Sequence, residues 1–179
     1  MTDPSLAKGE RDTQTVTKQG VSLASRIDGV RTRATTNHVD HRGTVFEIFE
    51  GDLEFWGTPI VYAYQFSIRP GLLKGWGLHE HKSDRYTLIE GEVMIVLYDA
   101  RPDSATHGVV QRVVLSDRGE RQVIIPPFVW HVSINLLDTE AKLINFPTNV
   151  YNHEAPDRLL LPWNTPEIPA NLADLFPFF

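Results

Sequence analysis

Two histidines that flank a single residue and are followed by an aspartate could do chemistry. They are His79, His81 and Asp84, in the segment GLHEHKSDRYTLIEG (residues 77–91). On a β-strand, residues 79 and 81 project from the same face, so both imidazoles would enter one cavity. A further histidine, His131, follows a proline turn in IIPPFVWHVSIN. We expect these four side chains to meet, either as metal ligands or around a base that transfers protons.

A divalent metal would suit this set of side chains. Three imidazoles and a carboxylate with an open coordination position fit Fe(II), Mn(II), Zn(II) or Ni(II) equally well. The chain has no cysteine, so thiolate ligands, thiolate nucleophiles and disulfides are excluded. In the structural alternative, the histidines face a polar cavity and are only hydrogen-bonded to carboxylates and hydroxyls.

The segments that must position these side chains are short and rich in β-branched and aromatic residues. Turn signals containing Pro, Gly, Asp and Ser separate them. In chain order they are TVFEIFE, IVYAYQFSI, RYTLIEG, EVMIVLYD, GVVQRVVLS, RQVIIPP, HVSINLL and AKLINFP. Helical periodicity of any length is absent. Many short strands at this spacing predict a sandwich or a barrel.

Composition predicts one folded domain with two atypical ends. The chain has 179 residues, of which 41% are hydrophobic, enough for a core without disulfides or a structural metal. Residues 1–20 are polar and are predicted to form a flexible arm, so the domain is expected to span residues 21–179. Near its proline-rich end, ANLADLF predicts a short helical segment, and Phe178 and Phe179 are expected to pack on the body or on a partner.

Charge and hydropathy exclude several classes of function. The net charge of −6 gives no electrostatic reason to bind nucleic acid. No apolar run approaches the roughly 20 residues that span a bilayer, and the N-terminus lacks the apolar region of a signal peptide. We therefore expect a cytoplasmic protein that binds neither nucleic acid nor membrane. An anionic substrate would require a local group of Arg and Lys side chains.

The histidine spacing resembles the two cupin motifs, G(x)5HxH(x)3-4E(x)6G and G(x)5PxG(x)2H(x)3N. In the first, Asp84 stands one residue early in place of the glutamate, and Gly91 ends the motif at the right distance. In the second, His131 and Asn135 match, whereas Phe128 replaces a glycine. This resemblance implies an all-β cupin jelly roll, a double-stranded β-helix barrel.

Further segments resemble the dTDP-4-dehydrorhamnose 3,5-epimerase family. DHRGTVFE is similar to the family's D-x-R-G-x-F-x-E, GLLKGWGLH to G-V-L-R-G-L-H, and YDARPDSATHG to D-x-R-x-x-S-P-T-x-G. VIIPPFVWHVSINL and FPTNVYNHEAPDRLLLPWNTPEIP also follow the family pattern, so the resemblance covers residues 27–169. It implies a metal-free homodimer that epimerises a nucleotide-linked 4-keto-6-deoxy sugar. Such an enzyme removes the proton beside the ketone and returns it to the opposite face.

The resemblance also implies roles for single side chains. Catalytic roles fall on His79 as the base, on His131 as its assistant, and on Tyr151, which matches a tyrosine that contacts the sugar or the nucleotide base. Contacts to the substrate are implied for Arg42, Glu47, Lys74 and Asn145.

Three departures separate this chain from the family pattern. The family's acid, a tyrosine, falls at Asn145, and an amide cannot act as an acid. Thr165 stands where an aspartate orients the histidine, and Asp84 replaces a lysine. Tyr64 and Tyr86 are left as candidates for the acid. Three alternatives follow: a sugar-nucleotide epimerase, a metal-dependent isomerase or dioxygenase that uses the four side chains named first, and a nucleotide-sugar-binding protein without catalysis.

Overall fold

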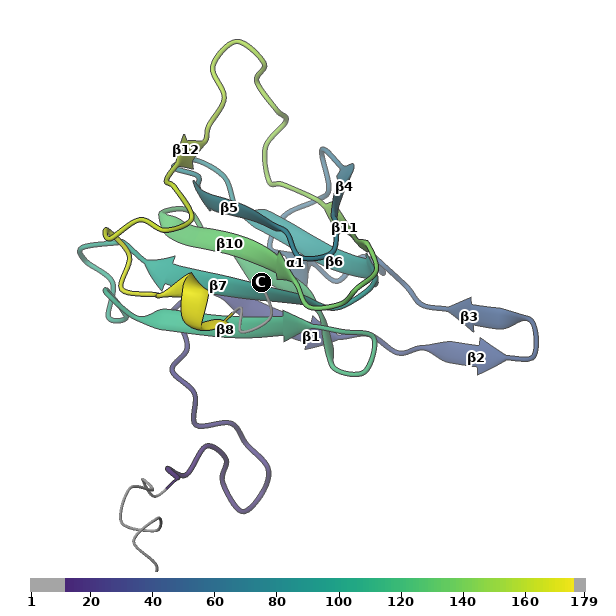
Figure 1. Ribbon diagram of the computed structural model, residues 1–179. Coiled ribbons are helices and arrows are strands. Elements are labelled where there is room, and N and C mark those ends of the chain that lie inside the picture. The colour runs from purple at the N-terminus through teal and green to yellow at the C-terminus, as the bar shows by residue number, and fades with distance from the viewer. Residues whose placement is uncertain (1–11, 176–179) are drawn as a thin grey trace, which may run out of the picture.

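In the computed structural model, which describes residues 12–175, two antiparallel five-stranded sheets pack face to face (Figure 1). The strands of the first sheet are β1 (Arg31–Ala34), β4 (Tyr64–Ile68), β6 (Asp84–Glu90), β9 (Glu120–Ile125) and β11 (Ala141–Asn145). Those of the second sheet are β5 (Leu73–Leu78), β7 (Val93–Asp99), β8 (Val110–Leu115), β10 (Val129–Asn135) and β12 (Leu159–Leu160). A separate hairpin contains β2 (His38–Asp40) and β3 (Gly43–Val45).

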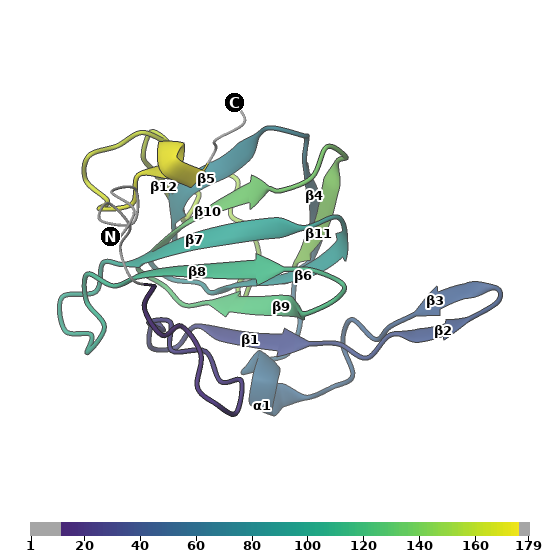
Figure 2. The same cartoon turned by 60° about the horizontal axis from the view of Figure 1, so that its bottom comes forward.

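The strand order is that of a jelly roll, as the sequence predicts. It is β1-β9-β6-β11-β4 in the first sheet and β12-β5-β10-β7-β8 in the second, so most neighbours in space are distant in sequence. Figure 2 shows the two layers from a second direction, with the β2–β3 hairpin projecting away from both. The cupin fold class is therefore confirmed.

The predicted strands from IVYAYQFSI to AKLINFP all form, IVYAYQFSI over its last five residues as β4. Of TVFEIFE, however, only Thr44 and Val45 belong to a strand, β3. The chain leaves β3 at Val45 and later makes one helical turn, α1 (Leu53–Trp56). The Asp52 carboxylate caps this turn by accepting the backbone N–H groups of Glu54 and Phe55, at 2.9 and 3.2 Å. The sequence GDLEFWG contains the helix-capping residues, Asp52 before the turn and Gly57 after it, but it is too short to show a helical period.

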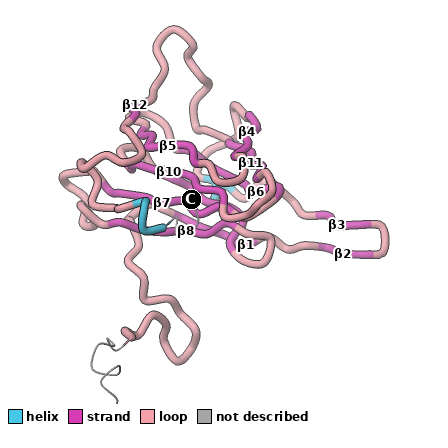
Figure 3. Tube along the Cα trace, viewed as in Figure 1, coloured by secondary structure: helices cyan, strands magenta, loops and turns pink. Residues whose placement is uncertain are grey.

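Helical structure is confined to two short pieces in the described part of the chain (Figure 3). Besides α1, a 3-10 turn, η2 (Leu172–Leu175), forms where ANLADLF predicted a helical segment. No helix among these residues is long and apolar enough to cross a membrane. Residues 1–11 of the predicted arm, and Phe178 and Phe179, lie outside the described residues. The domain boundary near residue 20 stays a prediction.

Strand alternation on β10 supplies both an apolar outer face and a polar inner one. Trp130, Val132 and Ile134 face outward, where they pack with Ile168 and Leu172 of the C-terminal segment. The residues between them face the first sheet, and they include His131 and Ser133. The C-terminal segment thus covers the back of the strand that carries His131.

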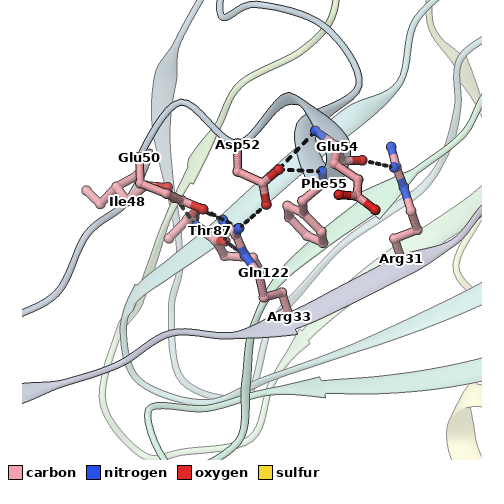
Figure 4. Close-up of polar contacts among 9 residues, drawn as sticks. All are labelled: Arg31, Arg33, Ile48, Glu50, Asp52, Glu54, Phe55, Thr87 and Gln122. Carbon is pink, nitrogen blue, oxygen red and sulfur yellow. Dashed lines mark hydrogen bonds and ion pairs between the residues drawn. The ribbon is translucent and has the colours of Figure 1, made fainter.

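The outer face of the first sheet is covered by the segment that contains α1, and polar contacts fasten it there (Figure 4). The Arg33 guanidinium on β1 pairs with Glu50 and with Asp52, which is also the cap of α1. The Gln122 amide on β9 donates to the Ile48 carbonyl at 2.8 Å and to Thr87 of β6 at 3.1 Å. These bonds satisfy polar groups that the covering segment removes from water.

Arg85 anchors β6 from the outer face of the first sheet. Its side chain is fully buried and donates to the main-chain carbonyls of Trp56, Thr58 and Phe146. A buried guanidinium needs such acceptors because it cannot lose its charge. Since successive strand residues point to opposite faces, the anchored Arg85 sets Asp84 and its neighbour Tyr86 on the inner face.

The two cupin motifs meet at the turn before β10. Phe128 occupies the motif's glycine position and keeps the left-handed conformation that glycine favours, with φ of 59°. Its backbone N–H donates to the His79 carbonyl at 2.8 Å, and its carbonyl accepts from the Ala100 N–H. The turn therefore holds the backbone of His79 against the start of the strand that carries His131.

Candidate active site

A cavity of about 260 Å³ lies between the two sheets. His79, at the end of β5, and His131, on β10, line it from the second sheet. Tyr64 on β4 and Asp84 and Tyr86 on β6 line it from the first sheet. Long-range pairing thus brings together side chains that the sequence places far apart.

Asp84 lies at the centre of the polar contacts in this cavity and is only 2% exposed. Its Oδ2 atom is 3.1 Å from Nε2 of His79 and 3.4 Å from Nε2 of His131. The same oxygen accepts the Tyr86 hydroxyl at 2.8 Å, and Oδ1 accepts the Asn145 amide at 2.8 Å. The structure thus brings three of the four expected side chains together, His79, Asp84 and His131, and their catalytic and metal-binding roles stay predictions.

The backbone determines where each histidine carries its hydrogen. Nδ1 of His79 faces the Asp157 carbonyl, and Nδ1 of His131 lies 3.1 Å from the Val129 carbonyl. A carbonyl oxygen only accepts, so both Nδ1 atoms must be donors. Each Nε2 then points a lone pair at the Asp84 carboxylate unless the ring is protonated.

Opposing effects act on the ionisation of Asp84. Burial by itself raises the pKa of a carboxyl group, but hydrogen bonds and charge from His131 and His79 outweigh burial. The pKa of Asp84 is held well below its ordinary value, so the side chain is a carboxylate at neutral pH. The cavity thus contains a fixed negative charge that can stabilise an imidazolium.

His81 does not join this group, contrary to the prediction. β5 ends at Leu78 and the chain then bends, so the strand alternation that would align residues 79 and 81 no longer applies. His81 is exposed, and its nearest carboxylates are those of Glu80 and Asp157 at the surface. The set of converging ligands is therefore His79, Asp84 and His131, without His81.

Asp157 positions His79, and sequence reasoning missed it. Its carboxylate accepts the backbone N–H groups of Glu80 and His81 at 2.8 and 3.1 Å, and its main-chain carbonyl accepts Nδ1–H of His79. A main-chain contact leaves no signal in residue type. The only sequence signal for the Asp157 carboxylate was its position in the segment FPTNVYNHEAPDRLLLPWNTPEIP, which follows the family pattern.

Three cations line the cavity although the chain as a whole is acidic. Lys74 was predicted, whereas Lys82 and Arg158 were not. Lys82 is 6% exposed and makes no hydrogen bond or ion pair with another described residue; its ammonium lies 5.7 Å from the Tyr151 ring centre. An ammonium that lines the cavity and has no protein partner among these residues is suited to bind an anion. The available sequence signal for Lys82 was its position between His81 and Asp84, within the first cupin motif.

Tyr151 also lines the cavity, on the loop after β11, and its contact with the sugar or the nucleotide base stays a prediction. Arg42 and Glu47 do not line the cavity of their own chain. Arg42 lies at the turn of the projecting hairpin, where it pairs with Asp40. The reason is that Thr44 and Val45 belong to the returning strand of the projecting hairpin, and Glu47 then lies near Arg33 and Glu50, outside the cavity.

Asn145 lies behind the cavity wall, and the expectation that it contacts substrate directly does not fit its contacts. It is fully buried, and its Oδ1 accepts the Arg85 backbone N–H at 3.0 Å. Its Nδ2 donates to Asp84 at 2.8 Å and to the Tyr64 hydroxyl at 2.9 Å. Both donor hydrogens are used within the protein, so Asn145 holds two cavity side chains in place.

Comparison with known proteins identifies a single family over most of the chain. The family model described as dTDP-4-dehydrorhamnose 3,5-epimerase matches residues 24–174. A probable low-salt glycan biosynthesis epimerase of Haloferax volcanii is 30% identical over 139 residues, covering 77% of this chain and 89% of that protein. A spore coat polysaccharide biosynthesis protein of Bacillus subtilis is 32% identical over 148 residues, covering 81% and 95%.

Solved structures agree on the fold. The dTDP-6-deoxy-D-glucose-3,5-epimerase of Legionella pneumophila, solved in complex with dTDP-4-keto-L-rhamnose, superposes with a TM-score of 0.70. It shares 23% identity, with 83% of this chain and 80% of that chain covered.

The unpaired Lys82 leads to a prediction about anion binding. Replacing it by Met should weaken binding of inorganic diphosphate about tenfold or more, because a charge-assisted bond contributes roughly 1.5–3 kcal/mol. Isothermal titration calorimetry at fixed ionic strength would measure the change. Lys142→Met is the matched control, since Lys142 is partly exposed and pairs with Glu90. Equal affinities for the two variants would contradict the assignment.

Proposed function

The chain belongs to the dTDP-4-dehydrorhamnose 3,5-epimerase family, and on that premise we propose that it epimerises a nucleotide-linked 4-keto-6-deoxy sugar with His79 as the base. One observation carries the assignment of the base. Nδ1–H of His79 is held by a backbone carbonyl, so the neutral ring carries its lone pair on Nε2, the nitrogen that lies inside the cavity 3.1 Å from Asp84. That is the tautomer that a base requires.

Asp84 takes the place of the orienting carboxylate that is absent at Thr165. When His79 removes the proton beside the ketone, it becomes an imidazolium 3.1 Å from the Asp84 oxygen. A buried carboxylate at this distance stabilises that charge. His131 lies on the other side of the same oxygen, and in its protonated form it can assist as a second donor through Nε2–H. Enolate formation needs such a donor near the ketone oxygen.

The three cations suit the diphosphate of a sugar nucleotide. Lys74, Lys82 and Arg158 line the same cavity as His79, so a substrate anchored by its phosphates would place its sugar among the polar groups. Arginine can donate two parallel bonds to a phosphate. The dTDP-sugar complex of the Legionella relative supports this class of ligand. We assign Tyr151, beside Lys82, a contact with the sugar or the base.

The role of His79 can be tested by solvent exchange. His79→Gln should lower deuterium uptake from D2O into dTDP-linked 4-keto-6-deoxy sugars by roughly a thousandfold, since general base catalysis contributes about 10²–10⁴. Mass spectrometry of the recovered sugar nucleotide measures the uptake. His81→Gln, an exposed histidine two residues away, is the control and should retain exchange. Tight binding of sugar nucleotides by the wild type without any exchange would instead indicate a binding protein.

We further propose a homodimer in which the β2–β3 hairpin of one subunit reaches the cavity of the other. The hairpin projects from the body (Figure 1), and its Val39 and Val45 are 73% and 68% exposed. Arg42 and Glu47 are predicted to bind substrate but do not line the cavity of their own subunit. In a dimer they would line the cavity of the second subunit instead. The cytoplasmic location stays a prediction.

Subunit mixing tests this arrangement. Arg42→Ala and His79→Gln should each be nearly inactive, but the dissociated and remixed pair should recover about a quarter of wild-type activity. Half of randomly paired dimers are mixed, and each mixed dimer has one intact site. Size-exclusion chromatography with light scattering verifies the dimer. Absence of recovery in verified mixed dimers would show that Arg42 acts within its own chain or not at all.

A second candidate function is a metal-dependent isomerase or dioxygenase, and one observation favours it. Two Nε2 atoms and one carboxylate oxygen converge, as in the two-histidine, one-carboxylate sites of non-haem iron enzymes. Ligands about 2.1 Å from one ion lie roughly 3.0–3.4 Å apart, close to the 3.1 and 3.4 Å seen from Asp84 to the histidines. Both rings also donate Nδ1–H to backbone carbonyls, as metal-binding histidines do.

Chelation separates the two candidates. The epimerase proposal predicts that exchange activity is unchanged after exhaustive dialysis against a chelator. The metal proposal predicts loss of activity, and recovery with Fe(II), Mn(II), Zn(II) or Ni(II). It also predicts about one ion per chain by elemental analysis, lost in Asp84→Asn and kept in His81→Gln. Less than a tenth of an ion per wild-type chain, before and after reloading, would exclude the metal proposal.

A further inference from the structure

The proposed epimerisation needs an acid that faces His79 from across the sugar. The base removes a proton from one face of the carbon, so inversion requires a proton from the other face. The family's acid position is Asn145, whose amide cannot supply one. We infer that Tyr64 is the catalytic acid and that Asn145 holds it in place, an inference that rests on the proposed epimerase function.

Tyr64 lies on the opposite wall from the base. It begins β4 at the edge of the first sheet, whereas His79 follows β5 of the second sheet. Both line the same cavity, and alternation along β4 also directs Phe66 into it. A sugar ring between the two sheets would therefore present one face to His79 and the other to Tyr64.

Hydrogen bonding leaves the Tyr64 proton free for transfer. The Arg85 N–H donates to Oδ1 of Asn145, which fixes the orientation of the amide. Nδ2 of Asn145 must then donate to the Tyr64 oxygen, at 2.9 Å. That oxygen is an acceptor in this bond, and its own hydrogen has no acceptor among the described residues. Burial and the nearby Asp84 raise the pKa of Tyr64, so the hydroxyl stays protonated at neutral pH.

The two other tyrosines of the cavity are placed differently. Tyr86 donates its hydroxyl to Asp84 at 2.8 Å, which commits its proton to the carboxylate. Tyr151 lies on a loop with its ring beside the Lys82 ammonium, among the cations that suit the phosphates. Tyr64 alone of the three combines a strand position, a fixed oxygen and an uncommitted proton, as far as the described residues show.

The proton balance is complete without a cofactor. His79 takes the proton from the carbon beside the ketone, and the C–H electron pair forms the enolate. Tyr64 then gives its O–H proton to the same carbon from the other face, and the enolate returns to the ketone. This leaves a phenolate at Tyr64 and an imidazolium at His79 beside Asp84. Exchange with bulk water restores both groups.

Stereochemistry in D2O tests the assignment. Tyr64→Phe should form inverted product at least 100-fold more slowly, since acid catalysis contributes about 10²–10⁴. It should still incorporate deuterium into recovered substrate of unchanged configuration, because His79 can return a deuteron to the face it deprotonated. NMR and mass spectrometry of the sugar distinguish these products. Tyr62→Phe is the matched control, since Tyr62 lies two residues away and does not line the cavity.

Each outcome bears on the assignment. Inversion at the wild-type rate in Tyr64→Phe would overturn it, as would equal loss of exchange and inversion. The exchange-without-inversion phenotype in Tyr151→Phe or Tyr86→Phe, but not in Tyr64→Phe, would move the role to that tyrosine. A wild-type protein that neither exchanges nor inverts any sugar of the panel would overturn the proposed function itself.

Discussion

The buried carboxylate of Asp84 is the constraint on which the site depends. A carboxylate out of reach of water is tolerated only where donors or positive charge surround it. Here they come from both sheets: His79 and His131 from one, Tyr86 and Asn145 from the other. Satisfying this one charge therefore fixes the two walls of the cavity relative to each other. It also provides the charge that stabilises a protonated base.

In the proposed reaction, phosphate binding and proton transfer fall to different side chains of the same cavity. The cations that suit a diphosphate include Lys82, which has no partner among the described residues and so is ready to bind an anion. The groups suited to proton transfer surround Asp84 and already bond to one another. This division lets energy from phosphate binding position the sugar, while the proton-transfer groups need little rearrangement when the substrate arrives.

Lost family residues have been replaced by contacts from elsewhere in the fold. The family's orienting aspartate is absent at Thr165, and in the proposed mechanism Asp84, a position that is a lysine in the family pattern, takes its role. Held by the Asp157 carbonyl, His79 keeps the tautomer of a base without that aspartate. The tyrosine missing at Asn145 leaves an amide that contacts the Tyr64 hydroxyl instead. The cavity is thus polar although three positions differ in residue type from the family pattern.

By itself the sequence determined the jelly roll, the convergence of His79, Asp84 and His131, and the family. The jelly roll rests on short alternating strands, which are local patterns, whereas the convergence and the family rest on the likeness of the motif spacing to known families. Only the tertiary structure decided that His81 lies outside the site, because strand alternation ends at Leu78. Only the tertiary structure placed Lys82 and Arg158 in the cavity and joined Tyr64 to Asn145. Those contacts depend on which strands become neighbours, and pairing between segments about 80 residues apart leaves no local pattern to read.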